Sequence, residues 1–295
     1  MKRLIAKFYR RLTKPVRVMA DFHDWLLGRT SVQSGPLRTI IGVQQAHFVQ
    51  QLLGTAKYQD PRNLSKSEHQ VFSQSGEDGI IREIFRRVGV TNKVFAELGI
   101  GDGLECNTTF LLWQSWSGYW IDKTDKPANI FDTFKLELST GSLKFANSFV
   151  TAENIVGLFR ELGVPQEPDL LSVDIDMNTY YVWKSLREYK PRVVVVEYNA
   201  VIPSDMEWVV AYDQKSAWRG NHYFGASLKS LELLGLEMGY KLVGCGIAGI
   251  NAYFVREDLC DEQKFQSPFT SETHFEPARF FLTPMRGTHR RSFRG

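Results

Sequence analysis

The stretch FAELGIGDG at residues 95–103, followed by GYWID at residues 118–122, decides the fold of this chain. Together they predict a buried strand, a glycine-rich turn, a helix and a second strand that ends in an acid. Glu97 closes the first strand. Asp122 ends the second, where a carboxylate can accept hydrogen bonds from both hydroxyls of a ribose, as on doubly wound sheets that bind nucleosides.

The spacing of the glycines indicates which nucleoside cofactor would bind. The pattern acid-x-Gly-x-Gly-x-Gly differs from the Gly-x-Gly-x-x-Gly of dinucleotide sites, where a pyrophosphate rests on a helix N-terminus. S-adenosylmethionine (SAM) has no pyrophosphate, so the spacing favours SAM. The alternative is a turn without a ligand. The predicted cofactor-binding residues are Glu97, Gly99, Gly101, Asp102, Asp122 and, near the adenine, Glu153.

The composition is that of a folded protein of 295 residues, with 43% hydrophobic and 23% charged residues. No run of 18 apolar residues is present, and the N-terminus lacks the apolar segment of a secretory signal. Cys106, Cys245 and Cys260 are widely spaced, without a metal-ligand pattern, which indicates a reducing compartment. We expect a cytoplasmic protein.

The charge is unevenly distributed along the chain. Residues 1–20 and 277–295 contain twelve of the 36 basic residues and no acid, so the remaining 24 basic residues face 33 acidic ones. An acidic body argues against a nucleic-acid substrate, which normally requires a basic stripe. Apolar residues at helical spacing within residues 1–12 predict a basic amphipathic helix, either at the inner face of an anionic membrane or packed on the body.

Strands and helices alternate from residue 71 onward. The predicted strands span residues 93–99, 118–122, 143–150, 169–176, 192–199, 239–247 and 251–258. Continuous apolar strands separated by helices predict an α/β fold with a doubly wound, mostly parallel seven-stranded sheet of the Rossmann-like, class I methyltransferase type. The predicted divisions are a helical extension (1–70), a catalytic domain (71–260) and a basic tail (261–295). Ser75 and Asp78 fit a capping box for the first helix of the domain.

Polar side chains follow two neighbouring predicted strands at the carboxyl edge of the sheet, where ligands bind. Asp174, Glu197 and Asn199 offer the oxygen ligands that Mg²⁺ prefers, and a metal there would orient an acceptor hydroxyl. Asp174 and Asn178 are alternatively N-caps of the helix that follows. For the general base, the candidates are Asp176 and His222.

Six segments carry a resemblance to a known family: SQSGEDGI, ELGIGDGLECNT, WSGYWID, LLSVDIDMNTYYVW, VVVVEYN and YFGASLKSL. Together, over residues 72–257, they resemble the FkbM-like SAM-dependent methyltransferases of surface-polysaccharide and natural-product clusters. The resemblance implies O-methylation, most often of a sugar hydroxyl. Metal-dependent relatives carry a Lys or His where this chain has Met177, so their base is missing here.

The predicted function is transfer of a methyl group from SAM to a sugar hydroxyl of a surface glycan or glycolipid. Mg²⁺ assistance and a homo-oligomeric state stay open at this point. The alternatives are a non-catalytic Rossmann-like scaffold in a polysaccharide assembly complex and a nicotinamide-dependent oxidoreductase, which the glycine spacing disfavours.

Overall fold

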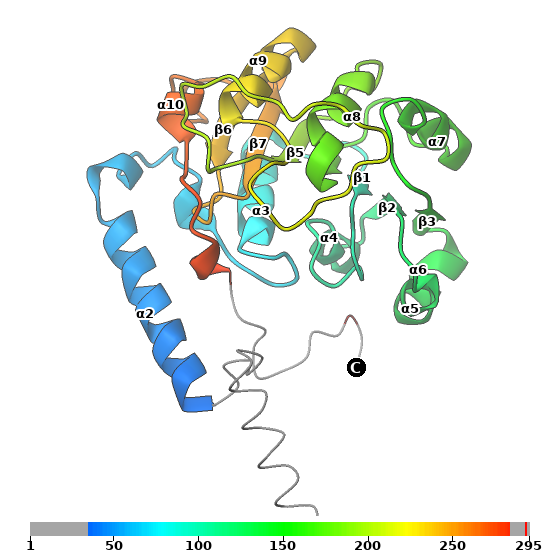
Figure 1. Ribbon diagram of the computed structural model, residues 1–295, viewed down its shortest axis with the longest axis horizontal. Helices are drawn as coiled ribbons and strands as arrows, with labels where there is room; N and C mark the ends of the chain where they lie inside the picture. Colours follow the sequence, from blue (N-terminus) through cyan, green and yellow to red (C-terminus); the bar gives the residue numbers. More distant parts are fainter. Residues whose placement is uncertain (1–34, 284–292, 294–295) are drawn as a thin grey trace, which may run out of the picture. The chain divides into compact units, whose positions relative to one another are not determined.

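Figure 1 shows the computed structural model of the chain, which describes residues 35–283 and residue 293. The predicted amphipathic helix at residues 1–12 lies outside these residues, as do residues 284–292 and 294–295 of the predicted basic tail. The chain divides into two compact units at Gln51 and Leu52. The predicted boundaries after residues 70 and 260 differ from this division, because Leu64 and Phe265 are both buried in the core of the second unit.

The second unit contains a single seven-stranded sheet with the order β3-β2-β1-β4-β5-β7-β6. All neighbouring strands are parallel except for β7, which runs antiparallel to both β5 and β6. The prediction of a class I methyltransferase type of fold is confirmed by this order. The strands are β1 (Val94–Leu98), β2 (Ser117–Asp122), β3 (Leu143–Asn147), β4 (Leu170–Val173), β5 (Val193–Glu197), β6 (Tyr240–Cys245) and β7 (Asn251–Arg256).

Helices connect the strands and cover the sheet (Figure 1). The α-helices are α2 (Gly35–Leu53), α3 (Glu77–Val88), α4 (Thr109–Trp113), α5 (Pro127–Thr133), α6 (Lys135–Thr140), α7 (Ile155–Leu162), α8 (Thr179–Ser185), α9 (Leu228–Met238) and α10 (Ser271–His274). The 3-10 turns are η1 (Ala56–Tyr58), η2 (Ser65–Ser67), η3 (Asp176–Asn178), η4 (Glu257–Leu259) and η5 (Phe280–Leu282). Across residues 35–283, no helix is both long and apolar enough to span a membrane.

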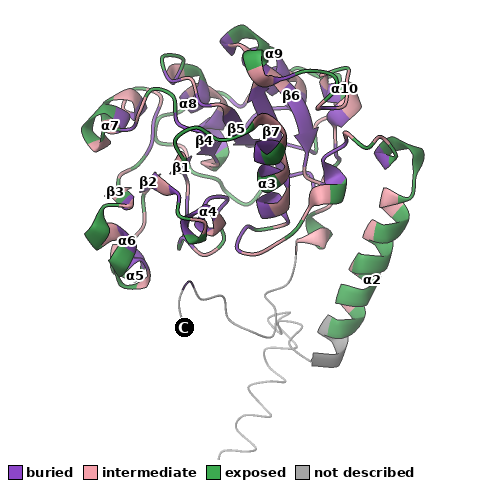
Figure 2. Ribbon diagram, turned by 180° about the vertical axis from the view of Figure 1, so that it is seen from behind, coloured by how far each residue is buried: buried purple, intermediate pink, exposed green. Residues whose placement is uncertain are grey.

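Both faces of the sheet are buried, since successive side chains of each strand enter different cores (Figure 2). Ala96 and Val194 belong to the core beneath α7, α8 and α9. Phe95 and Val195 belong to the core beneath α3, α4 and α5. Because the central strands are buried on both faces, ligand chemistry is expected at the ends of the sheet.

The start of α3 differs from the predicted capping box. Asp78 pairs with Ser73 instead of Ser75: its Oδ2 accepts from the Ser73 amide at 2.9 Å and from the Ser73 hydroxyl at 2.8 Å. The Asp78 amide donates back to Ser73 Oγ at 3.1 Å. The N-cap position is Gly76, which makes no side-chain cap hydrogen bond, so the predicted capping box is wrong. The Ser73–Asp78 pair instead joins the bend at residues 71–76 to the first turn of the helix.

A buried carboxylate organises the amino end of the sheet. Asp169, which has no exposed surface, accepts hydrogen bonds from the amides of Thr91, Asn92 and Lys93 and lies 3.3 Å from Arg192 Nε. Asp169→Ala would leave the buried Arg192 Nε without its carboxylate and would remove the acceptor of the three backbone amides. We expect a loss of about 3 kcal/mol in the free energy of unfolding, measured by urea denaturation.

The matched control for this substitution is Glu188→Gln, which removes a largely exposed ion pair with Arg160. It should change the free energy of unfolding by less than about 0.5 kcal/mol. Equal effects of the two substitutions would contradict the assigned role of Asp169.

Candidate functional site

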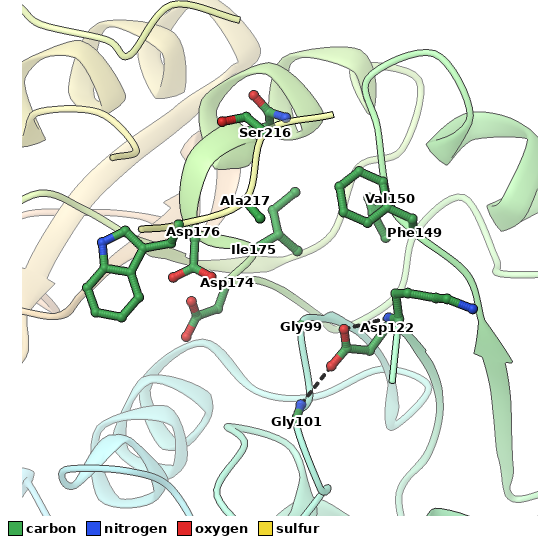
Figure 3. A pocket seen from close by; sticks show the side chains of 13 residues that line it. Gly99, Gly101, Asp122, Phe149, Val150, Asp174, Ile175, Asp176, Ser216 and Ala217 are labelled. Atoms are coloured by element: carbon green, nitrogen blue, oxygen red, sulfur yellow. Dashed lines mark hydrogen bonds between the residues drawn. The ribbon is translucent and has the colours of Figure 1, made fainter. Parts of the chain in front are cut away.

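Two cavities open at the carboxyl ends of β1, β2 and β4, where the sequence predicts ligand binding. Figure 3 shows the residues that line the larger of these two. One has a volume of about 450 Å³ and the other of about 370 Å³. Gly99, Gly101 and Asp174 line both. The two cavities therefore meet at the glycine turn, and an elongated ligand can occupy both at once. We call them the first and second cavity.

The glycine turn packs directly against the end of β4. Gly99 has φ +81°, and a Cβ there would lie 1.6 Å from the carbonyl oxygen of Asp174. Any side chain at this position would therefore collide with the backbone. The turn is joined to its neighbours by hydrogen bonds from Gly99 N to Ile121 O at 3.1 Å and from Asp174 N to Leu98 O at 3.0 Å. These contacts fix the junction of the two cavities.

Asp122 holds the turn from the other side. Its Oδ2 accepts from Ile100 N at 3.0 Å and from Gly101 N at 2.8 Å, and its Oδ1 accepts from Lys123 N at 2.6 Å (Figure 3). Asp122 also lines the first cavity. Each carboxylate oxygen has two lone pairs, so this side chain can support the turn and still accept from ligand hydroxyls.

Glu97 is buried and orients the start of α4. Its carboxylate accepts from Asn107 N at 2.8 Å, Thr108 N at 3.1 Å and Ser172 Oγ at 3.1 Å. Burial raises its pKa, and these donors oppose the rise. Glu97 lines the second cavity together with Asp102, whose Oδ1 accepts from Leu104 N. Glu97 therefore holds the residues before α4 in place beside the second cavity.

The adenine side of the predicted site is made by residues that the sequence did not single out. Phe149 and Val150, just beyond β3, line the first cavity. Glu153 lies outside both cavities; it is exposed and accepts a hydrogen bond from the Tyr212 hydroxyl, which lowers its pKa. The assignment of Glu153 to the cofactor stays a prediction, which its position outside both cavities does not support. Phe149, an aromatic residue two positions after the end of β3, is the sequence feature from which this part of the lining could have been predicted.

Asp174 and Glu197 form a pair of carboxyl groups at the ends of β4 and β5. Burial and the charge of Asp176 raise the pKa of Asp174 to about 7. Burial and the charge of Asp174 raise the pKa of Glu197 well above its usual range. Glu197 Oε2 is buried without a hydrogen-bond partner among the described residues. Each carboxyl group therefore favours the protonated form of the other.

The predicted metal site does not form. Asn199 is fully buried and turned into the following loop: its Nδ2 donates to the carbonyls of His222 and Phe224, and its Oδ1 accepts from Val201 N. Within residues 35–283, no group of three or more His, Cys, Asp or Glu side chains could hold a metal ion. The predicted donor set does not fit Mg²⁺, because Asn199, one of its three ligands, holds the following loop instead.

The two candidate bases are in different places. Asp176 lines the first cavity next to Asp174 and has φ +56°, a left-handed conformation that costs about 1 kcal/mol. Partial desolvation and, secondly, the charge of Asp122 raise the pKa of Asp176. His222 is exposed and lines neither cavity. Of the two predicted bases, Asp176 is therefore the one placed to take a proton from a ligand in the first cavity.

The predicted cap roles for α8 are not observed. Asn178 occupies the N-cap position without capping the helix; its Nδ2 donates instead to the carbonyl of Asp213 at 2.9 Å. This bond fixes the segment that covers the first cavity, which is lined by Ser216, Ala217 and Trp218. These residues lie some forty positions after β4, so no local pattern could have linked them to the site.

No protein-family model matches the chain, and no curated protein matches its sequence. Similar solved structures include magnesium protoporphyrin IX methyltransferase from Synechocystis PCC 6803 with bound SAM, at 10% identity and a TM-score of 0.41, over 72% of this chain and 97% of that one. The N-terminal domain of EvdMO1 with SAH bound has 14% identity and a TM-score of 0.40, over 64% and 81%. An O-methyltransferase family protein from Burkholderia thailandensis has 11% identity and a TM-score of 0.38, over 73% and 71%.

At these TM-scores the likenesses carry no argument about activity. The fold class rests on the strand order with its antiparallel β7. Membership of the FkbM-like family remains a prediction.

The carboxyl pair makes stability depend on pH. The folded-state pKa of Asp174, about 7, is above its usual value of 3.8, so its favourable contribution is complete below about pH 4 and is lost as the pH rises through 7. We predict that the free energy of unfolding of Asp174→Asn, taken relative to that of the wild type, rises by about 1–2 kcal/mol between pH 5 and pH 8.5. Urea denaturation of both proteins at the two pH values measures this. If the difference in unfolding free energy between the two proteins is the same at both pH values, the raised pKa of Asp174 is contradicted.

Proposed function

We propose that the protein is a SAM-dependent O-methyltransferase that methylates a sugar hydroxyl of a surface glycan or glycolipid. The observation that carries this proposal is the glycine turn held by Asp122, at which the two cavities meet. The nucleoside would lie in the first cavity, with Asp122 on the ribose and Phe149 against the adenine. The amino-acid part would lie in the second.

The charge of the cavities supports a cationic cofactor. The second cavity is lined by Glu97, Asp102, Glu105 and Asp174, with no basic residue among its lining. A nicotinamide dinucleotide would bring a pyrophosphate to these carboxylates, which repel it. SAM supplies a methyl group activated by a positively charged sulfur, and the acids around the junction attract that charge.

The protein's contribution to the reaction is positioning and proton removal. As the acceptor oxygen bonds to the methyl carbon, the bond from that carbon to sulfur breaks, so orientation matters more than acid–base power. The hydroxyl proton must leave, and the Asp176 carboxylate, with its raised pKa, is the acceptor we assign. The products are the demethylated cofactor, a methyl ether and a proton.

The resemblance to FkbM-like enzymes supports the sugar acceptor. Twelve basic residues within 1–20 and 277–295 support peripheral contact with anionic lipid, where a lipid-linked glycan would be presented. The scaffold alternative requires a turn that binds no nucleoside. The strained Asp176 and the buried carboxyl pair disfavour it, because such features cost stability and accumulate at functional sites.

The cofactor assignment is tested by thermal unfolding with SAM, its demethylated product or NAD, each with Mg²⁺ or EDTA. At about a hundred times its dissociation constant, SAM should add about 2.7 kcal/mol and raise the midpoint by several degrees. NAD should not, and Mg²⁺ should add nothing beyond EDTA. Asp122→Ala removes both the ribose acceptor and the support of Gly101 N, so we expect SAM affinity to fall at least tenfold.

Asp125→Ala is the matched control, since this exposed acid lies three residues further on and lines neither cavity. The cofactor assignment fails if Asp122→Ala binds SAM as tightly as the wild type. A midpoint unchanged by any nucleoside would favour the scaffold.

The proton acceptor is tested by Asp176→Asn and His222→Ala. Asp176→Asn keeps the shape of the side chain and removes the base, so kcat should fall by about 10²–10³ while SAM affinity stays within threefold. His222→Ala should retain kcat within about twofold, because the ring is exposed and outside the cavities. Steady-state kinetics with isotope-labelled SAM measure both. The reverse order of effects would make His222 the base.

A further inference from the structure

A third cavity lies on the acceptor side of the sheet and has no role in binding the cofactor. Its volume is about 390 Å³, large enough for a monosaccharide unit. The residues that give it chemical character are Met177, Tyr212, Asp213, Arg219, Asn221 and Tyr223. All but Met177 come from the long connection between β5 and α9.

The third cavity adjoins the first. Ser216 and Ala217 line both, so the two cavities lie on either side of one short stretch of chain with small side chains. Met177 lines the third cavity and directly follows Asp176, which lines the first. A ligand in the third cavity is therefore a close neighbour of the residue assigned to remove the acceptor proton.

The connection that forms the third cavity is held in place by tertiary contacts. Val210 N donates to Gly225 O at 2.9 Å, which closes residues 210–225 into a loop. The Tyr181 hydroxyl from α8 donates to Val210 O at 2.8 Å, and Trp218 Nε1 donates to Asn221 O at 2.7 Å. The cavity wall is thus joined to the carboxyl end of β4 through α8.

The lining combines the three kinds of group that recognise saccharides. Tyr223 is 54% exposed and is held edge-on to Trp208, with ring centroids 5.5 Å apart, so its ring can stack on a sugar face. Asp213 uses Oδ1 for Lys215 N, and Asn221 uses Oδ1 for Tyr223 N. Among residues 35–283 and 293, Asp213 Oδ2 has no hydrogen-bond donor and the amide nitrogen of Asn221 has no acceptor, so both can bond hydroxyls.

Arg219 is the basic residue of this cavity's lining. Its side chain has no hydrogen bond or ion pair with the residues that the structure describes. A guanidinium binds a carboxylate or phosphate through two parallel hydrogen bonds, which a neutral sugar cannot offer. The first cavity has the basic residue Lys123 beside three acids and the second has no basic residue, so the third, with Arg219 and the single acid Asp213, best matches an anionic group.

We propose that the third cavity is the acceptor site and that it binds a saccharide unit carrying an anionic group, with Arg219 paired to that group. This inference rests on the proposed function and names the substrate class for it. The anionic group is a carboxylate, as in a uronic acid, or a phosphate.

The test is binding of three probes to the full chain saturated with the demethylated cofactor: a methyl glucuronide, glucose 6-phosphate and a methyl glucoside. Saturation-transfer NMR and calorimetry measure the affinities. At least one anionic probe should bind about tenfold tighter than the neutral glucoside, and the tighter one identifies the group. Arg219→Ala should abolish the difference, and Arg219→Lys should keep part of it.

Lys215→Ala is the matched control, since it removes an exposed cation from the same loop but not from the cavity lining. It should leave all three affinities within twofold. Equal affinity for the neutral glucoside, an unchanged preference in Arg219→Ala, or no binding of any probe would overturn the proposal. A SAM shift that persists in Arg219→Ala shows that the variant is folded, and it separates failure of this inference from failure of the cofactor assignment.

Discussion

The bond between the Asp122 carboxylate and the amides of Ile100 and Gly101 is the interaction on which the rest of the site depends. It connects the end of β2 to the turn after β1. Because the turn also lies against the carbonyl of Asp174, its position sets where the two cofactor cavities meet. One side chain thereby joins three strands at the edge where parallel sheets bind ligands. Asp122 also lines the first cavity, so the side chain that supports the turn is accessible to a ligand there.

Negative charge is the second constraint on this edge. Carboxylates follow β1, β2, β4 and β5, and in an apolar setting they repel one another. The structure moderates this repulsion in two ways. Glu97 accepts hydrogen bonds from Asn107 and Thr108, just before α4, and the pKa values of Asp174 and Glu197 are raised toward the neutral forms. A cationic cofactor would relieve what remains, whereas a divalent metal would need ligands that are already engaged elsewhere.

The connection between β5 and α9 lines both the first and the third cavity. It covers the first cavity with Ser216 and Trp218 and forms the third with Arg219 and Tyr223. Asn178 and Asn199 hold this connection to the sheet through their side-chain amides. Loops of this kind carry specificity on a rigid scaffold because they can vary without disturbing the core. Cofactor binding and acceptor choice are thus assigned to different parts of the fold.

The sequence by itself determined the strands and helices and the glycine turn. Apolar strands separated by helices determined the sheet, and the spacing of the glycines before Asp122 determined the turn, since both depend on residues close together in the chain. Only the tertiary structure decided the rest. In the tertiary structure the Asn199 amide bonds the loop at residues 222–224, Asp78 pairs with Ser73 instead of Ser75, and Ser216 lines the first cavity. These arrangements depend on hydrogen bonds and packing between particular residues, which the periodic pattern of apolar residues in the sequence does not reveal.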